Sequence, residues 1–249
     1  MSITALEESQ TDGAVDNAET ISGLVRDHLK TAIASVGTWV SAFSEEALTR
    51  LGQPDTQREV GQLAFIDGYH RIRQTSPLIL AAIQSLDRGR DHDNAKFWVH
   101  HLDEEYGHDA AMRRDIVAMI ADESEATRIL DATAITPPSA AMIGFFDYQV
   151  RHGNPHLLIV LRLFLETVMA ELDDGQAAAV HELLPGGSEV IRLHRDADQD
   201  HVGECYDYVD RNFTESELPT LIWAVDFIAL CLNEGNSWIS AQVLGRASA

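Results

Sequence analysis

Hydrophobic residues recur at steps of three and four along most of the chain, the spacing that places side chains on one face of an α-helix. The pattern is clear in "ISGLVRDHLKTAIASVGTWVSAF" from residue 21, in "REVGQLAFIDGYHRI" from residue 58, and across residues 221–230. No segment shows the alternation of polar and apolar residues that is typical of strands. The sequence therefore predicts an all-α protein.

Glycine and proline divide this helical pattern into about eight helices. The breaks are "GQPD" (52–55), "TSP" (75–77), "DRGRDHD" (87–93), "TPPS" (136–139), "HGNP" (152–155) and "LLPGGSE" (183–189). Ser76, Asn154 and Ser188 are expected N-caps, because a side-chain acceptor there satisfies free amides of the first turn. No repeat or long linker follows, so we expect a flexible acidic tail over residues 1–20 and a single helical domain over 21–249.

The composition narrows the range of partners. The chain has 249 residues, 45% of them hydrophobic, which is enough for a sizeable core. Forty acidic and 18 basic residues give a formal net charge of −22. Long-range repulsion then disfavours nucleic-acid phosphates and anionic membrane surfaces as main partners.

The N-terminal sequence and the cysteines bear on the compartment. The first twenty residues lack the basic and apolar regions of a secretory signal, and no later apolar run is expected to reach the roughly 20 residues that span a bilayer. Cys205 and Cys231 are too few for a disulfide framework and are interpreted as reduced packing residues. We therefore expect a cytoplasmic protein.

The first candidate for chemistry is "RLHRDADQDH", residues 192–201. On a helix, His194, Asp198 and His201 lie at offsets of four and seven and so share one face. Two imidazoles and a carboxylate could meet one metal ion there. The alternative is a solvated helix surface whose histidines happen to align.

A second segment, "WVHHLDEEYGHDAAM", offers a matching pair. Glu105 and His108 are three residues apart, as are Asp198 and His201, so two predicted helices each present a carboxylate and a histidine. Helical bundles that hold two iron or manganese ions use this arrangement, with further carboxylates from other helices. His101, one heptad before His108, and Glu104 are weaker candidates on the same segment.

A further carboxylate, Glu166, lies in the apolar segment "HLLIVLRLFLETVMAEL". It shares a helix face with Leu163 and Met169, which favours an inward carboxylate and hence a ligand. The alternative is an i,i+4 ion pair with Arg162 on an exposed edge. Arg162, Arg192 and Arg195 are candidates for holding a substrate carboxylate, because a guanidinium matches the geometry of that group. Asp67, in "FIDGYHRI", is better explained as a hydrogen-bonded core residue.

These motifs resemble the haem-oxygenase-like dimetal oxidases, relatives of the thiaminase-like TenA and the quinone-biosynthesis PqqC proteins. The resemblance rests on the Hx3Dx2H pattern, on "DEEYGH" and on the acid between them, and it covers roughly residues 55–247. It implies a haem-oxygenase-like bundle in which the predicted domain binds metal. The ligands that it implies are Glu105, His108 and His201 for one iron, with Glu166, His194 and Asp198 for the second iron or as bridges.

The resemblance also implies a function. It is that of a non-haem diiron oxidase or oxygenase, with two Fe(II) ions or manganese as cofactor and O2 as co-substrate. The implied substrate is a small amine, amino acid or related metabolite, which is N-oxygenated, desaturated or cleaved at a C–C bond. A homodimer is implied as well.

Three alternatives remain from the sequence. A metal-independent enzyme of the same fold would need a cysteine or a basic cluster in its pocket. A ferritin-like metal-binding bundle would place its carboxylate–histidine pairs symmetrically in two helix hairpins. A non-enzymatic helical interaction protein would leave the candidate ligands facing solvent. Serine-nucleophile and phosphate-loop chemistry lack their motifs, because the chain has neither GxSxG nor GxxxxGK[ST].

Overall fold

The computed structural model describes residues 20–36, 41, 43–172, 174–183, 185 and 189–246. Within these ranges, the side chains of residues 176, 177, 179, 183, 194–200 and 246 are not described. The described residues form α-helices and short 3-10 turns and contain no strand, which confirms the all-α prediction. Of the predicted tail, residues 1–19 lie outside the described residues.

The helices are α1 (Ile21–Ser35), α2 (Glu45–Leu51), α3 (Pro54–Ile72), α4 (Thr75–Arg88), α5 (His92–Glu105), α6 (His108–Ile120), α7 (Glu123–Ala132), α8 (Pro137–His152), α9 (Leu158–Ala170), α10 (Asp174–Leu183), α11 (Glu189–Asn212) and α12 (Leu218–Arg246), with 3-10 turns η2 (Pro155–Leu157) and η3 (Glu215–Glu217). The surplus over the predicted eight comes from short helices such as α2, α7 and α10, which are 7, 10 and 10 residues long.

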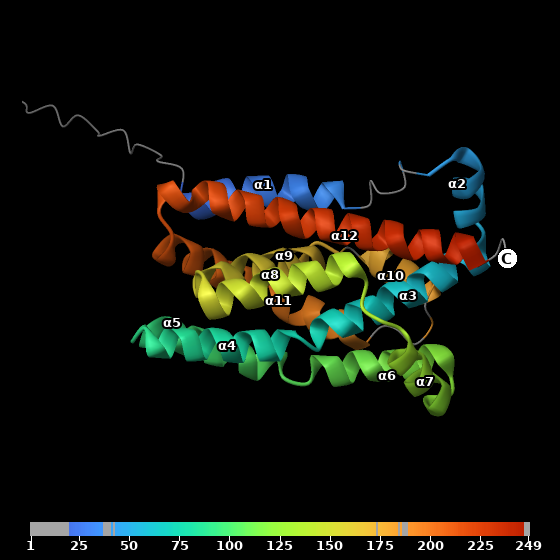
Figure 1. The fold of residues 1–249 in the computed structure, drawn as a ribbon, viewed down its shortest axis with the longest axis horizontal. Coiled ribbons are helices and arrows are strands. Elements are labelled where there is room, and N and C mark those ends of the chain that lie inside the picture. The colour runs from blue at the N-terminus through green and yellow to red at the C-terminus, as the bar shows by residue number, and fades with distance from the viewer. Residues whose placement is uncertain are drawn as a thin grey trace, which may run out of the picture.

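Helix α9 lies in the interior of the bundle (Figure 1). It packs against α1, α8, α11 and α12, while α4 and α5 form an antiparallel pair on the opposite side from α1 and α12. Nine of its 13 residues are buried, because its sequence, LIVLRLFLETVMA, is apolar on nearly every side. Any charged group on this helix is therefore carried into the core.

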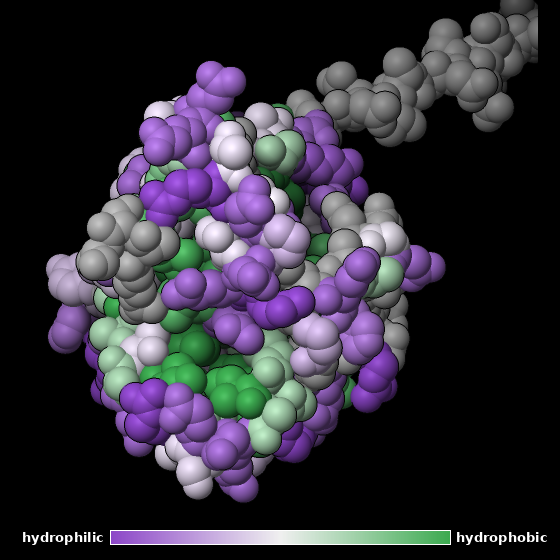
Figure 2. Space-filling view, turned by 90° about the vertical axis from the view of Figure 1, so that its right-hand side faces the viewer, coloured by the Kyte–Doolittle hydropathy of each residue, from purple (hydrophilic) through white to green (hydrophobic). Residues whose placement is uncertain are grey.

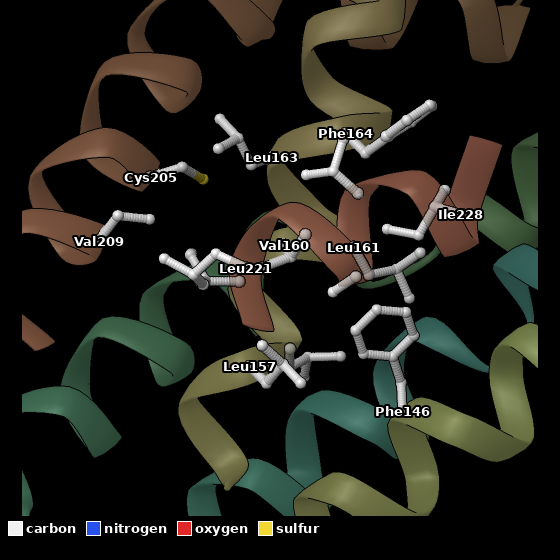
Figure 3. Close-up of a cluster of buried hydrophobic side chains, with 14 of the residues drawn as sticks. Phe146, Leu157, Val160, Leu161, Leu163, Phe164, Cys205, Val209, Leu221 and Ile228 are labelled. Carbon is white, nitrogen blue, oxygen red and sulfur yellow. The ribbon is translucent and has the colours of Figure 1, made fainter. Parts of the chain in front are cut away.

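The main hydrophobic core surrounds α9 (Figure 3). Leu163 and Phe164 of α9 are fully buried, as are Leu221 and Ile228 of α12. Cys205 of α11 also belongs to this core and is a free thiol. The prediction of a reduced packing cysteine is confirmed for Cys205, and Cys231 is likewise free and buried.

Two of the three predicted N-caps can be compared with the structure. The Asn154 side chain accepts a hydrogen bond of 3.0 Å from the backbone N–H of His156, as predicted. Ser76 is not an N-cap, because α4 already begins at Thr75 and Gln74 precedes it without a side-chain cap. Pro77 is compatible with this earlier start, since a proline in the first turn removes an amide that has no helical partner. Ser188 lies outside the described residues.

Helix α12 corrects one expectation. By length and composition, the stretch Glu215–Gly245 is apolar enough to cross a bilayer, although the sequence was expected to contain no such run. Scattered polar residues such as Asp226 and Glu234 interrupt its apolar pattern without lowering the average far. The helix packs along α1, α3, α8 and α9 as a core helix of the bundle.

Candidate functional site

The segment that carries Glu105 and His108 is bent. Helix α5 ends at Glu105 and α6 begins at His108, so the prediction that both residues share the face of one helix is wrong. Gly107 between them has a φ of 97°, a left-handed conformation that glycine adopts without steric cost. The bend nevertheless places His108 Nδ1 3.3 Å from Glu105 Oε2.

Arg162 joins the two buried carboxylates of the site. Its Nη1 forms an ion pair with Glu105 Oε1 and lies 2.6 Å from Glu166 Oε1. The three side chains are only 7%, 4% and 2% exposed, respectively. The i,i+4 pair between Arg162 and Glu166 therefore exists, but in the core and not on the exposed edge that the sequence alternative assumed.

Electrostatics hold Glu105 and Arg162 in their charged forms. Burial alone would raise the pKa of Glu105, but the charge of Arg162, helped by the nearby His108, outweighs it and holds that pKa well below its usual value. Burial alone would lower the pKa of Arg162, and Glu105 and Glu166 together raise it instead. Two carboxylates and one guanidinium leave the triad with a net charge of −1.

Glu104 lies next to the triad of Glu105, Arg162 and Glu166 and contacts His201 of α11. His201 Nε2 lies 2.9 Å from Glu104 Oε1, and His201 Nδ1 lies 4.0 Å from Glu166 Oε2. On the other side, His101 Nδ1 lies 3.5 Å from Glu104 Oε2. The weaker candidate Glu104 and the stronger candidate Glu105 of α5 therefore both contribute to one cluster.

His101 is the most buried imidazole of the cluster, with no exposed surface. Burial, reinforced by the charge of Arg162, lowers its pKa to about 3, so the ring is neutral near pH 7 and can offer a nitrogen lone pair. Cys205 Sγ lies 3.9 Å from its Nε2. Burial raises the pKa of that thiol, which argues against a thiolate nucleophile at this position.

The described candidate ligands form one continuous chain of contacts of 4.0 Å or less. Starting at α6, the chain runs in the order His108, Glu105, Arg162, Glu166, His201, Glu104 and His101. His194 and Asp198 lie on α11, about two turns and one turn before His201, respectively, but outside the residues whose side chains the structure describes.

The side-chain atoms of this cluster are of types that bind metal ions. Imidazole nitrogen and carboxylate oxygen suit iron or manganese. Glu166 Oε2, Glu104 Oε2 and His101 Nδ1 are buried and make no hydrogen bond to the described residues. In the described part of the chain, however, no three His, Cys, Asp or Glu side chains are already arranged to hold an ion. Arg162 contacts both central carboxylates instead.

An apolar cavity of about 220 Å³ adjoins the triad. Glu105, Arg162 and Glu166 line one part of it, and Arg71 also borders it. Most of the remaining lining is apolar and comes from α3, α4, α6, α8 and α9, including Phe65, Leu78, Met112, Met142, Leu161 and Met169. Sequence reasoning missed this cavity, since its lining residues come from segments far apart along the chain.

A second hollow lies outside the cluster. It has a volume of about 450 Å³ and is formed by α3, α6 and α7, with Leu63, Ile116 and Ile129 among its lining residues. Apolar side chains are visible in a hollow at the end of the molecule that carries α2 and α7 (Figure 2). Its two charged lining residues are Glu59 and Arg128, and none of the candidate ligands borders it. Its chemistry does not match the predicted site.

Comparison with known proteins identifies the fold. The structure is similar to a crystal structure from Shewanella denitrificans OS217 described as a domain of unknown function with a heme oxygenase-like fold, with a TM-score of 0.64. The two share 16% sequence identity over 94% of this chain and 95% of that chain. Neither the protein-family models nor the curated proteins gave a match. The chain therefore has a haem-oxygenase-like fold, as the sequence predicted.

Proposed function

We propose that this protein is a non-haem dimetal oxidase or oxygenase that uses two Fe(II) ions, or manganese, to oxidise a small metabolite with O2. One observation carries the proposal: imidazole and carboxylate side chains from α5, α6, α9 and α11 meet in the core beside an apolar cavity. Glu105, His108, Glu166 and His201 would hold the metal, together with His194 and Asp198 of the same α11 stripe.

The energetics favour a function over a purely structural role. A buried ionic cluster contributes little net stability, because desolvation offsets most of the Coulomb attraction. A cluster kept only for folding would also be expected to satisfy its buried polar atoms. Glu166 Oε2 and Glu104 Oε2 make no hydrogen bond within the described residues. Unsatisfied, inward carboxylates next to a cavity are typical of functional sites.

The protein's own residues prepare the site for chemistry. When bound, ferrous ions would supply the electrons that reduce O2. Arg162 fixes the positions of Glu105 and Glu166, and neutral His101 adds a nitrogen donor that is not charged near pH 7. The mostly apolar lining of the cavity disfavours water beside the reacting groups, which limits side reactions.

The cavity limits the size of the substrate. An apolar cavity of about 150 Å³ accommodates benzene, and the volume here is about 220 Å³. A small amine or amino acid with an apolar side chain therefore fits better than a large cofactor-like molecule. Such a molecule would meet charged groups at one end of the cavity and apolar side chains elsewhere.

The alternatives are less consistent with the site. A metal-independent enzyme of this fold would use a cysteine or a basic cluster, but burial raises the pKa of Cys205, and Arg162 is held by two carboxylates. An interaction protein would expose the candidate ligands, yet Glu105 and Glu166 are buried, and the side chains of His108 and His201 are only 17% and 13% exposed.

The test is O2 consumption by protein that has been loaded with iron under anaerobic conditions. Oxygen uptake should require both iron and a member of a panel of small amines and amino acids, and H201N should lose most of it. Arg151→Gln on the exposed face of α8, where the arginine pairs with Asp147, is a control that should behave like wild type. Iron-independent uptake, or uptake unchanged in H201N, would contradict the proposal.

A further inference from the structure

Arg162 occupies a place that a bound cation would also favour. One of its nitrogens contacts Glu105 and Glu166 together, and no other lysine or arginine among the described residues forms an ion pair with either carboxylate. The two glutamates come from different helices, α5 and α9. The guanidinium therefore acts as the counter-cation that allows both carboxylates to be buried side by side.

We propose that Arg162 is a built-in counter-cation that a metal ion displaces from Glu105 and Glu166, and that the displaced guanidinium then holds a ligand's carboxylate in the adjoining cavity. The inference rests on the proposed metal-dependent function and adds a coupling between its two binding events. Metal and carboxylate should each strengthen the binding of the other, because coupling between two sites is reciprocal.

The formal charges of Glu105, Glu166 and Arg162 indicate the order in which metal and carboxylate bind. Without metal, Glu105, Glu166 and Arg162 sum to −1, so an anion that enters the cavity meets net repulsion. A single divalent ion changes this sum to +1, and in a buried site with a low effective dielectric such a change acts strongly on a nearby charge. Metal binding first and carboxylate binding second is therefore the favourable order.

The hydrogen bonding of Arg162 is consistent with its proposed role of holding a ligand's carboxylate. Its Nε and Nη2 are buried and make no hydrogen bond to the described residues, and the side chain borders the apolar cavity. A guanidinium presents its donors as a planar fork that matches a carboxylate. Beyond the Arg162 guanidinium, the lining of the cavity is mostly apolar. The ligand class is thus a small carboxylate whose remainder is apolar.

The first experiment measures iron affinity by calorimetric titration under anaerobic conditions. R162Q should bind Fe(II) at least tenfold more tightly than wild type, because the competing cation is gone, and its metal-free form should melt at a lower temperature. R162K keeps the charge but loses the fork, so it should fold and show a smaller gain in affinity. Equal or weaker binding by both variants would overturn the inference.

The control variant for this titration is R151Q. Arg151 forms an i,i+4 ion pair with Asp147, but on an exposed face of α8. R151Q changes the net charge by the same amount as R162Q, so it should leave iron affinity unchanged. A gain in R151Q equal to that in R162Q would mean that overall charge, and not the displacement of Arg162, sets the affinity.

The second experiment measures binding of hexanoate, with hexanol as a neutral probe of the same chain length. Hexanoate should bind iron-loaded wild type at least tenfold more tightly than metal-free protein, whereas hexanol should show little preference. R162Q should lose most of this preference. R71Q should keep it, because Arg71 borders the same cavity but lies 3.5 Å from Asp67. A preference that survives in R162Q would show that another group holds the carboxylate.

The outcomes separate this inference from the proposed function. If wild type and every variant fail to bind iron, the metal-dependent function is wrong. If wild type binds iron and neither affinity nor the hexanoate preference depends on residue 162, the function stands and only the role of Arg162 is refuted.

Discussion

The chain buries two carboxylates that each have an arginine four residues away on the same helix, Asp67 with Arg71 on α3 and Glu166 with Arg162 on α9. Asp67 accepts hydrogen bonds from the Thr136 backbone N–H at 2.7 Å and from Ser139 Oγ at 2.6 Å. Both of its oxygens are therefore satisfied.

Glu166 differs in its partners. Its Oε1 pairs with Arg162, but its Oε2 makes no hydrogen bond to the described residues and lies 4.0 Å from His201 Nδ1. The partners of Asp67 are the N-cap of α8, Thr136, and Ser139 in its first turn, so this carboxylate fixes the start of a helix, where negative charge is favourable. The partners of Glu166 are further ionisable groups. Asp67 and Glu166 are both buried, but Asp67 is fully hydrogen-bonded to the start of a helix, whereas one oxygen of Glu166 makes no hydrogen bond to the described residues.

Replacement of each carboxylate by its amide tests this difference most strongly. D67N should lower the free energy of unfolding by about 2 kcal/mol, because charge-assisted hydrogen bonds to a helix start are weakened. E166Q should cost less than about 1 kcal/mol, since one of its oxygens has no hydrogen bond to lose. Urea unfolding of both variants measures the two values. Equal costs would remove the distinction between the two sites.

A third buried polar group, Tyr208, extends the comparison. Its hydroxyl accepts a hydrogen bond from Trp98 Nε1 at 3.1 Å and lies 2.8 Å from His156 Nδ1. Y208F would leave both partners unpaired and should lower the free energy of unfolding by about 1–2 kcal/mol. Iron binding should be unaffected, because Tyr208 has no contact with Glu105 or Glu166 among the interactions described. A variant that loses iron but keeps its stability would contradict a structural role for Tyr208.

The smallest expected effect concerns pH. Burial lowers the pKa of His156, and this effect exceeds the opposite effect of the nearby Asp91 and Glu217. The hydroxyl of Tyr208 lies next to Nδ1 of the same ring. The folded state then binds fewer protons than the unfolded state just below the ordinary histidine pKa of about 6.5. Stability should therefore decrease as pH falls from 7.5 to 5.5, and less so in H156Q. An equal loss in the variant would show that His156 does not contribute to this dependence.

The sequence was sufficient to predict the fold class and which segments contribute residues to the candidate site. Helical periodicity and the glycine and proline breaks were sufficient for the all-α bundle, and Glu105, His108, Glu166 and His201 do lie in one chain of contacts. Whether they bind metal stays a prediction. Asp67 was interpreted as a hydrogen-bonded core residue, and its contacts confirm this.

Two features of the site could not be read from the sequence. Helix α9 is apolar on nearly all sides, so its periodicity does not tell which face Arg162 occupies, and the arginine was placed on an exposed edge in the alternative interpretation. A single glycine is tolerated within a helix, so Gly107 did not reveal the bend between α5 and α6. Both depend on packing between segments that are distant in sequence.

The most direct test of the account is the number of ferrous ions bound per chain by wild type, E166Q and D67N under anaerobic conditions. If the Glu166 cluster holds metal and the Asp67 cluster only fixes α8, wild type and D67N should bind about two ions per chain. E166Q should lose at least one of them or weaken their binding tenfold or more. Trace iron in wild type, or the same stoichiometry and affinity in E166Q as in wild type, would contradict the central claim.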